Sequence, residues 1–122
     1  MKTILIVDDE PSVRKMLQRM LATATHKVLE AGNGIEAEAL IVSNEVDLLI
    51  TDIVMPEKHG IDLIMTLKEK LPELPIIAIS GGGGVTGRFD YLEVAALVGA
   101  RNVLRKPFQA DELRQLVDEI IT

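Results

Sequence analysis

Carboxylates, a hydroxyl and an ammonium group follow short apolar runs at four places in the chain. The set is Asp8, Asp9, Asp52, Ser80 and Lys106. Three carboxylates in one crevice repel one another, so either one of them holds a proton or a cation neutralises them. Ligands that are all oxygen favour Mg²⁺ or another hard divalent ion such as Mn²⁺. Such an ion, with an ammonium and a hydroxyl group, suits the oxygens of a phosphoryl group.

Asp52 lies within the most informative stretch of the sequence, from Asp47 to Gly60. The run from Leu48 to Thr51 is long enough for a buried strand, and Pro56 and Gly60 mark a loop after it. A buried strand that delivers an acid to its end is how an α/β protein presents a reactive group. A carboxylate can act as a nucleophile and form an aspartyl phosphate. We interpret the other polar side chains of the set as converging on Asp52.

Strand and helix patterns alternate five times along the chain. The predicted strands are residues 3–7, 27–31, 48–51, 75–80 and 102–105. Apolar residues recur at helical spacing after each strand, with Pro11 at the start of the first helix and residues 89–98 forming the fourth. We place Met16, Met20 and Met65 in the core, and Asp111 as the cap of the last helix.

This alternation predicts a doubly wound α/β fold, (βα)5, with a five-stranded parallel sheet covered on both faces. In such sheets the site lies beyond the carboxyl ends of the strands, where the strand order reverses. The strand ends carry the five polar residues named first.

Composition narrows the function classes. The chain has 122 residues, a net charge of −6 and no cysteine, which predicts one domain without disulfides. The acidic balance and the scarcity of aromatic residues disfavour direct binding of nucleic acid. No apolar run approaches the roughly 20 residues of a membrane helix, so no membrane association is predicted and a cytoplasmic location follows by default. His26 and His59 lack ligand spacing and are interpreted as surface or loop residues.

Four motifs in order resemble the response-regulator receiver domain of two-component signalling. They are Val7-Asp8-Asp9-Glu10, Thr51-Asp52-Ile53-Val54-Met55-Pro56 with Gly60, Ser80-Gly81, and Lys106-Pro107-Phe108. The resemblance covers essentially residues 1–122 and implies the flavodoxin-like strand order 2-1-3-4-5. It therefore implies a single receiver domain, with no output domain in this chain.

The resemblance also implies a role for each matching residue. Asp52 is the phosphoacceptor, supplied by a phosphohistidine of a sensor kinase or phosphotransfer protein. The cation is held by Asp9, Asp52 and the backbone carbonyl of Val54, and by Asp8 through water. Lys106 pairs with the phosphoryl oxygens, and the Lys106–Pro107 peptide bond is cis.

Output is also implied by the resemblance. Ser80 moves to hydrogen-bond the phosphoryl group, which switches the surface for a downstream protein partner or a missing output domain. The first helix, around Arg14 and Met16, faces the kinase, and the fourth helix, fifth strand and fifth helix form the output face. The chain is then a phosphoacceptor that assists its own Mg²⁺-dependent transfer, not an enzyme.

The sequence departs from the family pattern in three places. Val103 stands where an aromatic switch residue is common, so output is expected to run through the neighbouring loop and fourth helix instead. Residues 82–87 look like an insertion and are predicted to be mobile without phosphate. Val54 and Gly82 have no side chain that can orient a hydrolytic water, which predicts slow self-dephosphorylation.

Two alternative functions, from other classes of protein, stay open. A pseudo-receiver would use the same fold only as a protein-interaction module, but all the acidic and basic positions are present. A hydrolase with a carboxylate nucleophile would usually show Asp-x-Asp after the first strand, and Asp8-Asp9-Glu10 does not fit that pattern.

Overall fold

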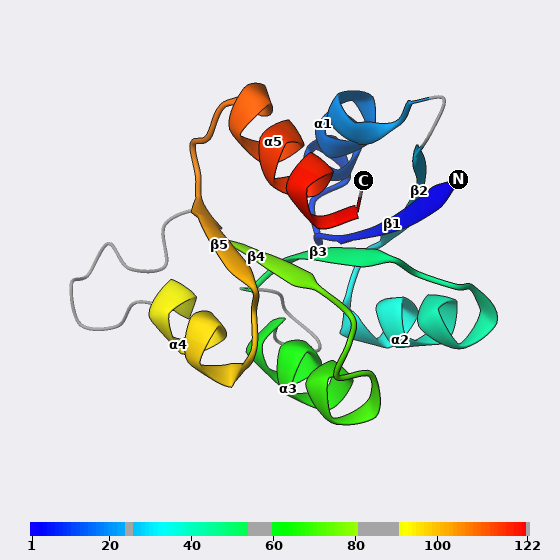
Figure 1. Ribbon diagram of the computed structural model, residues 1–122, viewed down its shortest axis with the longest axis vertical. Helices are drawn as coiled ribbons and strands as arrows, with labels where there is room; N and C mark the ends of the chain where they lie inside the picture. Colours follow the sequence, from blue (N-terminus) through cyan, green and yellow to red (C-terminus); the bar gives the residue numbers. More distant parts are fainter. Residues whose placement is uncertain (24–25, 54–59, 81–90, 122) are drawn as a thin grey trace.

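The computed structural model describes residues 1–23, 26–53, 60–80 and 91–121, with the backbone alone for 91–94. Strands and helices alternate as predicted (Figure 1). The strands are β1 (Lys2–Val7), β2 (His26–Ala31), β3 (Leu48–Asp52), β4 (Ile76–Ser80) and β5 (Asn102–Arg105). The helices are α1 (Pro11–Leu21), α2 (Gly34–Ser43), α3 (Gly60–Lys70), α4 (Tyr91–Val98) and α5 (Ala110–Ile121).

The strands form one parallel sheet in the order β2-β1-β3-β4-β5, which confirms the predicted fold class. The order reverses between β1 and β3, because β1 pairs with β2 on one side and with β3 on the other. In doubly wound sheets this reversal opens a crevice at the carboxyl ends of the strands. The predicted polar residues stand at that edge.

Two cores flank the sheet because successive side chains of a strand point to opposite faces. Leu5 and Val7 pack with α2, α3 and α4, whereas Ile4 and Ile6 pack with α1 and α5. Figure 1 shows these two helical layers on either side of the strands. The interior strand β3 is buried along its whole length, which explains its continuous apolar run.

Local signals set several helix ends. Pro11 begins α1, where its missing N–H has no partner to lose. The Asn33 side chain accepts a hydrogen bond from the Glu36 N–H at 2.9 Å and caps α2. Gly99 follows α4 with a φ of 129°, a value that suits glycine.

Several local predictions were wrong. Met16 and Met65 are 41% and 52% exposed rather than in the core. His26 is 9% exposed, buried at the start of β2 instead of at the surface. Asp111 lies inside the first turn of α5, since the helix begins one residue earlier and Gln109 precedes it. The described part of α4 begins at Tyr91, and residues 89–90 lie outside the described residues.

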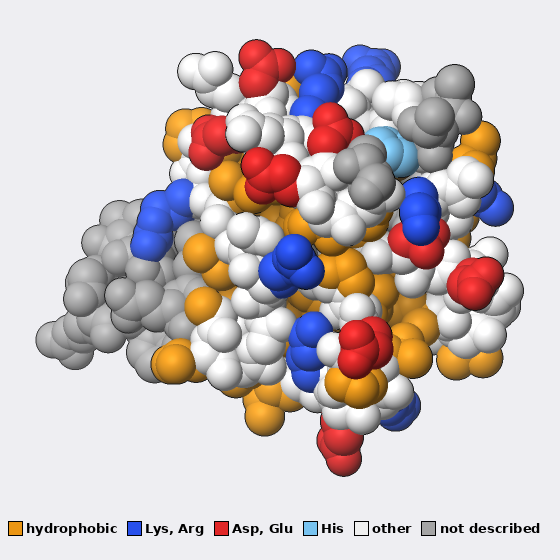
Figure 2. All heavy atoms as spheres, in the orientation of Figure 1, with side chains coloured by type: hydrophobic (Ala, Val, Ile, Leu, Met, Phe, Trp, Pro, Cys, Tyr) orange, Lys and Arg blue, Asp and Glu red, His pale blue; other side chains and the backbone are white. Residues whose placement is uncertain are grey.

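Exposed acidic side chains gather over α5 on the face drawn in Figure 2. The exposed acidic residues of α5 are Asp111, Glu112, Asp118 and Glu119. Basic side chains are interspersed across the rest of that face.

Candidate functional site

The site begins with Asp8, the residue that follows β1. Its N–H donates to the Ala31 carbonyl at 3.1 Å, which continues the pairing of β1 with β2 by one residue. Its Oδ1 accepts the Glu10 N–H at 2.9 Å. Glu10, not Asp8 or Asp9, occupies the N-cap position of α1, and it makes no side-chain capping hydrogen bond. Helix capping therefore does not account for the two aspartates.

Asp52 ends β3 and is held by the backbone on both sides. Ile53 donates its N–H to the Ile79 carbonyl at 3.1 Å, and Gly60 donates its N–H to the Ile53 carbonyl at 3.0 Å. The buried Thr51 hydroxyl donates to the Asp52 carbonyl at 2.8 Å. These bonds fix the peptide that carries the Asp52 side chain.

Three carboxylates meet at the strand ends. Asp8, Asp9 and Asp52 each offer a carboxylate oxygen, and these oxygens lie within 4.8 Å of one another. Asp8 and Asp52 are 2% and 8% exposed, whereas Asp9 is open to solvent. The sequence predicted this convergence from strand ends alone.

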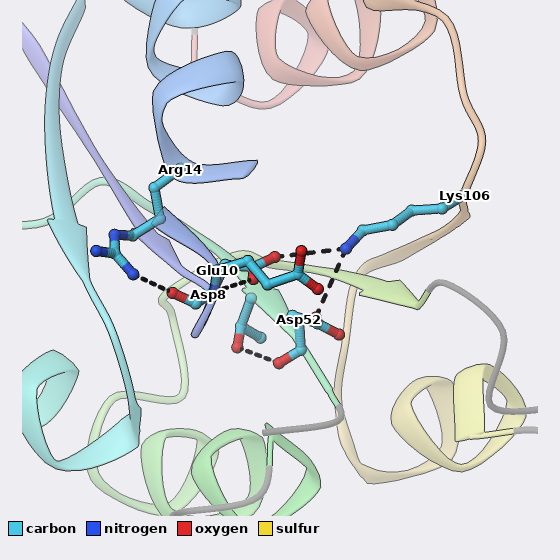
Figure 3. A network of polar contacts seen from close by, with 6 residues as sticks. Asp8, Glu10, Arg14, Asp52 and Lys106 are labelled. Carbon is cyan, nitrogen blue, oxygen red and sulfur yellow. Dashed lines mark hydrogen bonds and ion pairs between the residues drawn. The ribbon is translucent and has the colours of Figure 1, made fainter. Parts of the chain in front are cut away.

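Lys106 lies between two of these carboxylates (Figure 3). Its Nζ is 3.4 Å from Asp8 Oδ2 and 3.6 Å from Asp52 Oδ2. The ammonium of Lys106 therefore contacts two carboxylates of a cluster of three. A divalent cation would complete the neutralisation, and a donor set of oxygens fits Mg²⁺ or Mn²⁺.

Ser80 ends β4 beside these groups and is 4% exposed. Its carbonyl accepts the Lys106 N–H at 2.9 Å, so β4 and the residue after β5 are joined at this edge. The Lys106–Pro107 peptide bond is cis. Val103, on β5, is 39% exposed and lies opposite Ala78.

Some predicted positions lie outside the described residues. These are Val54, with its proposed ligand carbonyl, the histidine at 59, and the predicted insertion 82–87 that includes Gly82.

Arg14 was missed as a part of this site, because the resemblance assigned it, with Met16, to the surface that faces the kinase. Its side chain is only 20% exposed, and its Nη1 donates to the Asp8 carbonyl at 2.6 Å. Nothing in the local pattern of α1 indicates this contact, since arginine is also a common exposed helix residue.

Replacing Asp9 by Asn is expected to stabilise the cation-free protein by about 0.5–1 kcal/mol, because it removes one of three like charges. Among the described residues Asp9 has no ion-pair partner that the change would break. We expect Mg²⁺ to stabilise the wild type, and we expect the same variant to lose most of that stabilisation. Urea unfolding with and without Mg²⁺ measures both effects, and a less stable cation-free variant would contradict the prediction.

The sequence matches the description "Response regulator receiver domain" over residues 4–118. The chain belongs to the response regulator receiver family. Receiver domains are phosphoacceptors that histidine kinases phosphorylate, and they bind Mg²⁺ at an acidic pocket, which is where the three aspartates of this receiver lie.

Known relatives agree with this assignment. The receiver is 40% identical over 114 residues to the phosphate regulon transcriptional regulatory protein PhoB of Pseudomonas aeruginosa, covering 92% of this chain and 48% of PhoB. It thus spans about half the length of that relative. It is 33% identical over 122 residues to a chemotaxis protein CheY homolog of Campylobacter jejuni, covering 97% of this chain and 91% of the homolog.

A solved structure shows the same fold. The response regulator TrrA of Thermotoga maritima, in complex with Mg(2+)-BeF, superposes with a TM-score of 0.84 at 29% identity, covering 99% of this chain and 100% of TrrA. None of the helices in the described part of this receiver combines the length and apolar character that crossing a bilayer requires.

Proposed function

We propose that this receiver takes a phosphoryl group onto Asp52 from a phosphohistidine of a sensor kinase or phosphotransfer protein. The observation that carries the proposal is the cluster of Asp8, Asp9 and Asp52 with the Lys106 ammonium between two of them. A structural relative holds Mg(2+)-BeF, which supports a cation in the same kind of site.

In the proposed step an Asp52 carboxylate oxygen attacks phosphorus and the phosphorus–nitrogen bond of the phosphohistidine breaks. The electron pair of that bond leaves with the imidazole, and an acyl phosphate forms on Asp52. Lys106 turns from the carboxylates to the phosphoryl oxygens and offsets their charge. The Ser80 hydroxyl then donates a hydrogen bond to the same group.

The proposed cation is Mg²⁺ or Mn²⁺. Asp9, Asp52 and the Val54 carbonyl would hold it directly, and Asp8 would hold it through water. When bound, it neutralises and orients the phosphoryl oxygens. Without it, the Lys106 ammonium lies within 4 Å of a carboxylate oxygen of both Asp8 and Asp52.

The proposed output is a change of surface that a protein partner or an attached output domain reads, with no direct contact to nucleic acid or membrane. The described geometry offers a route, because the Ser80 carbonyl accepts the Lys106 N–H and Ser80 pairs with Arg105 of β5. Val103 of β5 and Leu97 of α4 are 39% and 85% exposed, so a partner can reach both side chains. The proposed location of the reaction is the cytoplasm.

The test is the intact mass of the purified chain after incubation with acetyl phosphate and Mg²⁺. We expect one added phosphoryl group, and none when a chelator removes the cation. A phosphohistidine protein serves as the second donor. Folded protein that takes no phosphoryl group from either donor would contradict the proposal and favour a pseudo-receiver that acts only through protein contacts.

A further inference from the structure

Arg14 joins three parts of the chain that meet beside the acidic cluster. It lies in the second turn of α1, and its Nη1 donates to the Asp8 carbonyl at 2.6 Å. Its Nε lies 3.3 Å from the Glu30 Oε1 on β2. A β-carbon at Gly32 would lie 3.5 Å from Nη1, so the guanidinium rests against the backbone that follows β2.

The Asp8 carbonyl belongs to the peptide bond between Asp8 and Asp9, in the turn that joins β1 to α1. Figure 3 shows Arg14 reaching this carbonyl on one side while the Asp8 carboxylate points to Lys106 on the other. The peptide that carries this carbonyl also leads to Asp9, the exposed member of the cluster. The position of that one peptide therefore sets where two of the three carboxylates lie.

A guanidinium suits this place better than other cations. It is planar and offers several donors in a fixed fork, so it can bond the Asp8 carbonyl and pair with Glu30 at the same time. The Arg14 and Glu30 side chains are 20% and 31% exposed, so the ion pair is partly shielded from water while it keeps the guanidinium in place. The ion pair serves to orient Arg14, because Glu30 holds the guanidinium where it donates to the Asp8 carbonyl.

We infer that Arg14 is a positioning residue that fixes the turn after β1 and so sets the placement of Asp8 and Asp9 for the cation. It touches neither cation nor phosphoryl group and acts through the Asp8 peptide. The part of the inference that concerns the cation rests on the proposed function. The part that concerns the order of the turn does not.

The test compares Arg14→Met and Arg14→Lys with the wild type by two measurements. Amide hydrogen exchange at Glu10, whose N–H bonds the Asp8 carboxylate, reports the turn without any cation. We expect exchange about tenfold faster in Arg14→Met, since a hydrogen bond that orders the turn is lost. The dissociation constant for Mg²⁺ comes from stability measured at increasing Mg²⁺, and should weaken about tenfold, as for other residues that orient metal ligands.

Arg19→Met is the matched control, since Arg19 is an exposed arginine in the last turn of the same helix. It removes the same charge and should change neither measurement. Arg14→Lys keeps the charge without the fork, and we expect it to behave like Arg14→Met. A residue that merely stabilised the fold would lower stability without moving the Mg²⁺ dissociation constant.

Three results would overturn the inference. The first is an amide exchange rate at Glu10 that is the same in Arg14→Met as in the wild type. The second is an unchanged Mg²⁺ dissociation constant in Arg14→Met, and the third is wild-type values of both measurements in Arg14→Lys. A wild type that binds no Mg²⁺ would instead contradict the proposed function. Exchange at Glu10 would still decide whether Arg14 orders the turn.

Discussion

Asp52→Asn is expected to lower phosphorylation of the chain by more than about 100-fold, because an amide replaces the only group proposed to attack phosphorus. The substitution keeps the size and shape of the side chain. The Ile53 N–H and the Thr51 hydroxyl can still donate the hydrogen bonds that hold the peptide. The measurement is intact mass after acetyl phosphate and Mg²⁺, with circular dichroism to verify folding. The loss should therefore report chemistry and not misfolding.

Asp47→Asn provides the matched control. Asp47 immediately precedes β3, at the opposite end from Asp52, and its carboxylate accepts the Thr3 N–H at 2.8 Å. An asparagine there can still accept that bond, so the variant should take the phosphoryl group like the wild type. A phosphoryl group retained at wild-type level in Asp52→Asn would place the acceptor elsewhere.

Gly60→Ala is expected to destabilise the fold by about 3–5 kcal/mol, a loss comparable to the largest effects of single substitutions. A β-carbon at Gly60 would overlap the Ile53 Cα and lie 2.5 Å from the Asp52 carbonyl oxygen. Both atoms belong to backbone, which cannot move aside as a flexible side chain does. The start of α3 must then shift from the end of β3, and we expect phosphorylation of Asp52 to fall as well.

Gly32→Ala separates this steric effect from the general cost of replacing glycine. At Gly32 the nearest atoms to a new β-carbon are 3.5–3.6 Å away and belong to the Arg14 and Glu36 side chains, an ordinary contact. Urea unfolding of the two variants should show a large loss only for Gly60→Ala. Equal stability of Gly60→Ala and the wild type would mean that α3 does not pack against β3 as closely as described.

The sequence by itself determined the fold class and the residues that converge. Helical spacing and short apolar runs are local signals, and their alternation is enough to predict a parallel sheet with helices on both faces. Each polar residue of the set stands at or just after a strand end, so the topology brings them to one edge without further information. Asp8 and Lys106 meet for this reason although they are 98 positions apart.

Only the tertiary structure decided which side chains are covered and which groups pair. Met16 and Met65 satisfy a helical apolar pattern, yet both are exposed because neighbouring elements cover only part of each helix. His26 is the first residue of β2, and neighbouring elements cover it. No local sequence pattern indicates that coverage. The periodicity of a sequence indicates which face of a helix or strand a side chain lies on. It does not indicate how much of that face other elements cover.

Arg14 shows the same limit at the site. Its place on α1 is compatible with solvent, and its partners lie on β1 and β2, which only the packing of α1 onto the sheet brings within reach. Likewise, the sequence does not indicate whether the Lys106 ammonium contacts Asp8, Asp52 or both. In the structure it lies between the two carboxylates. Local signals choose the strand ends, whereas distances between side chains from distant segments arise only when the whole sheet and its helices are assembled.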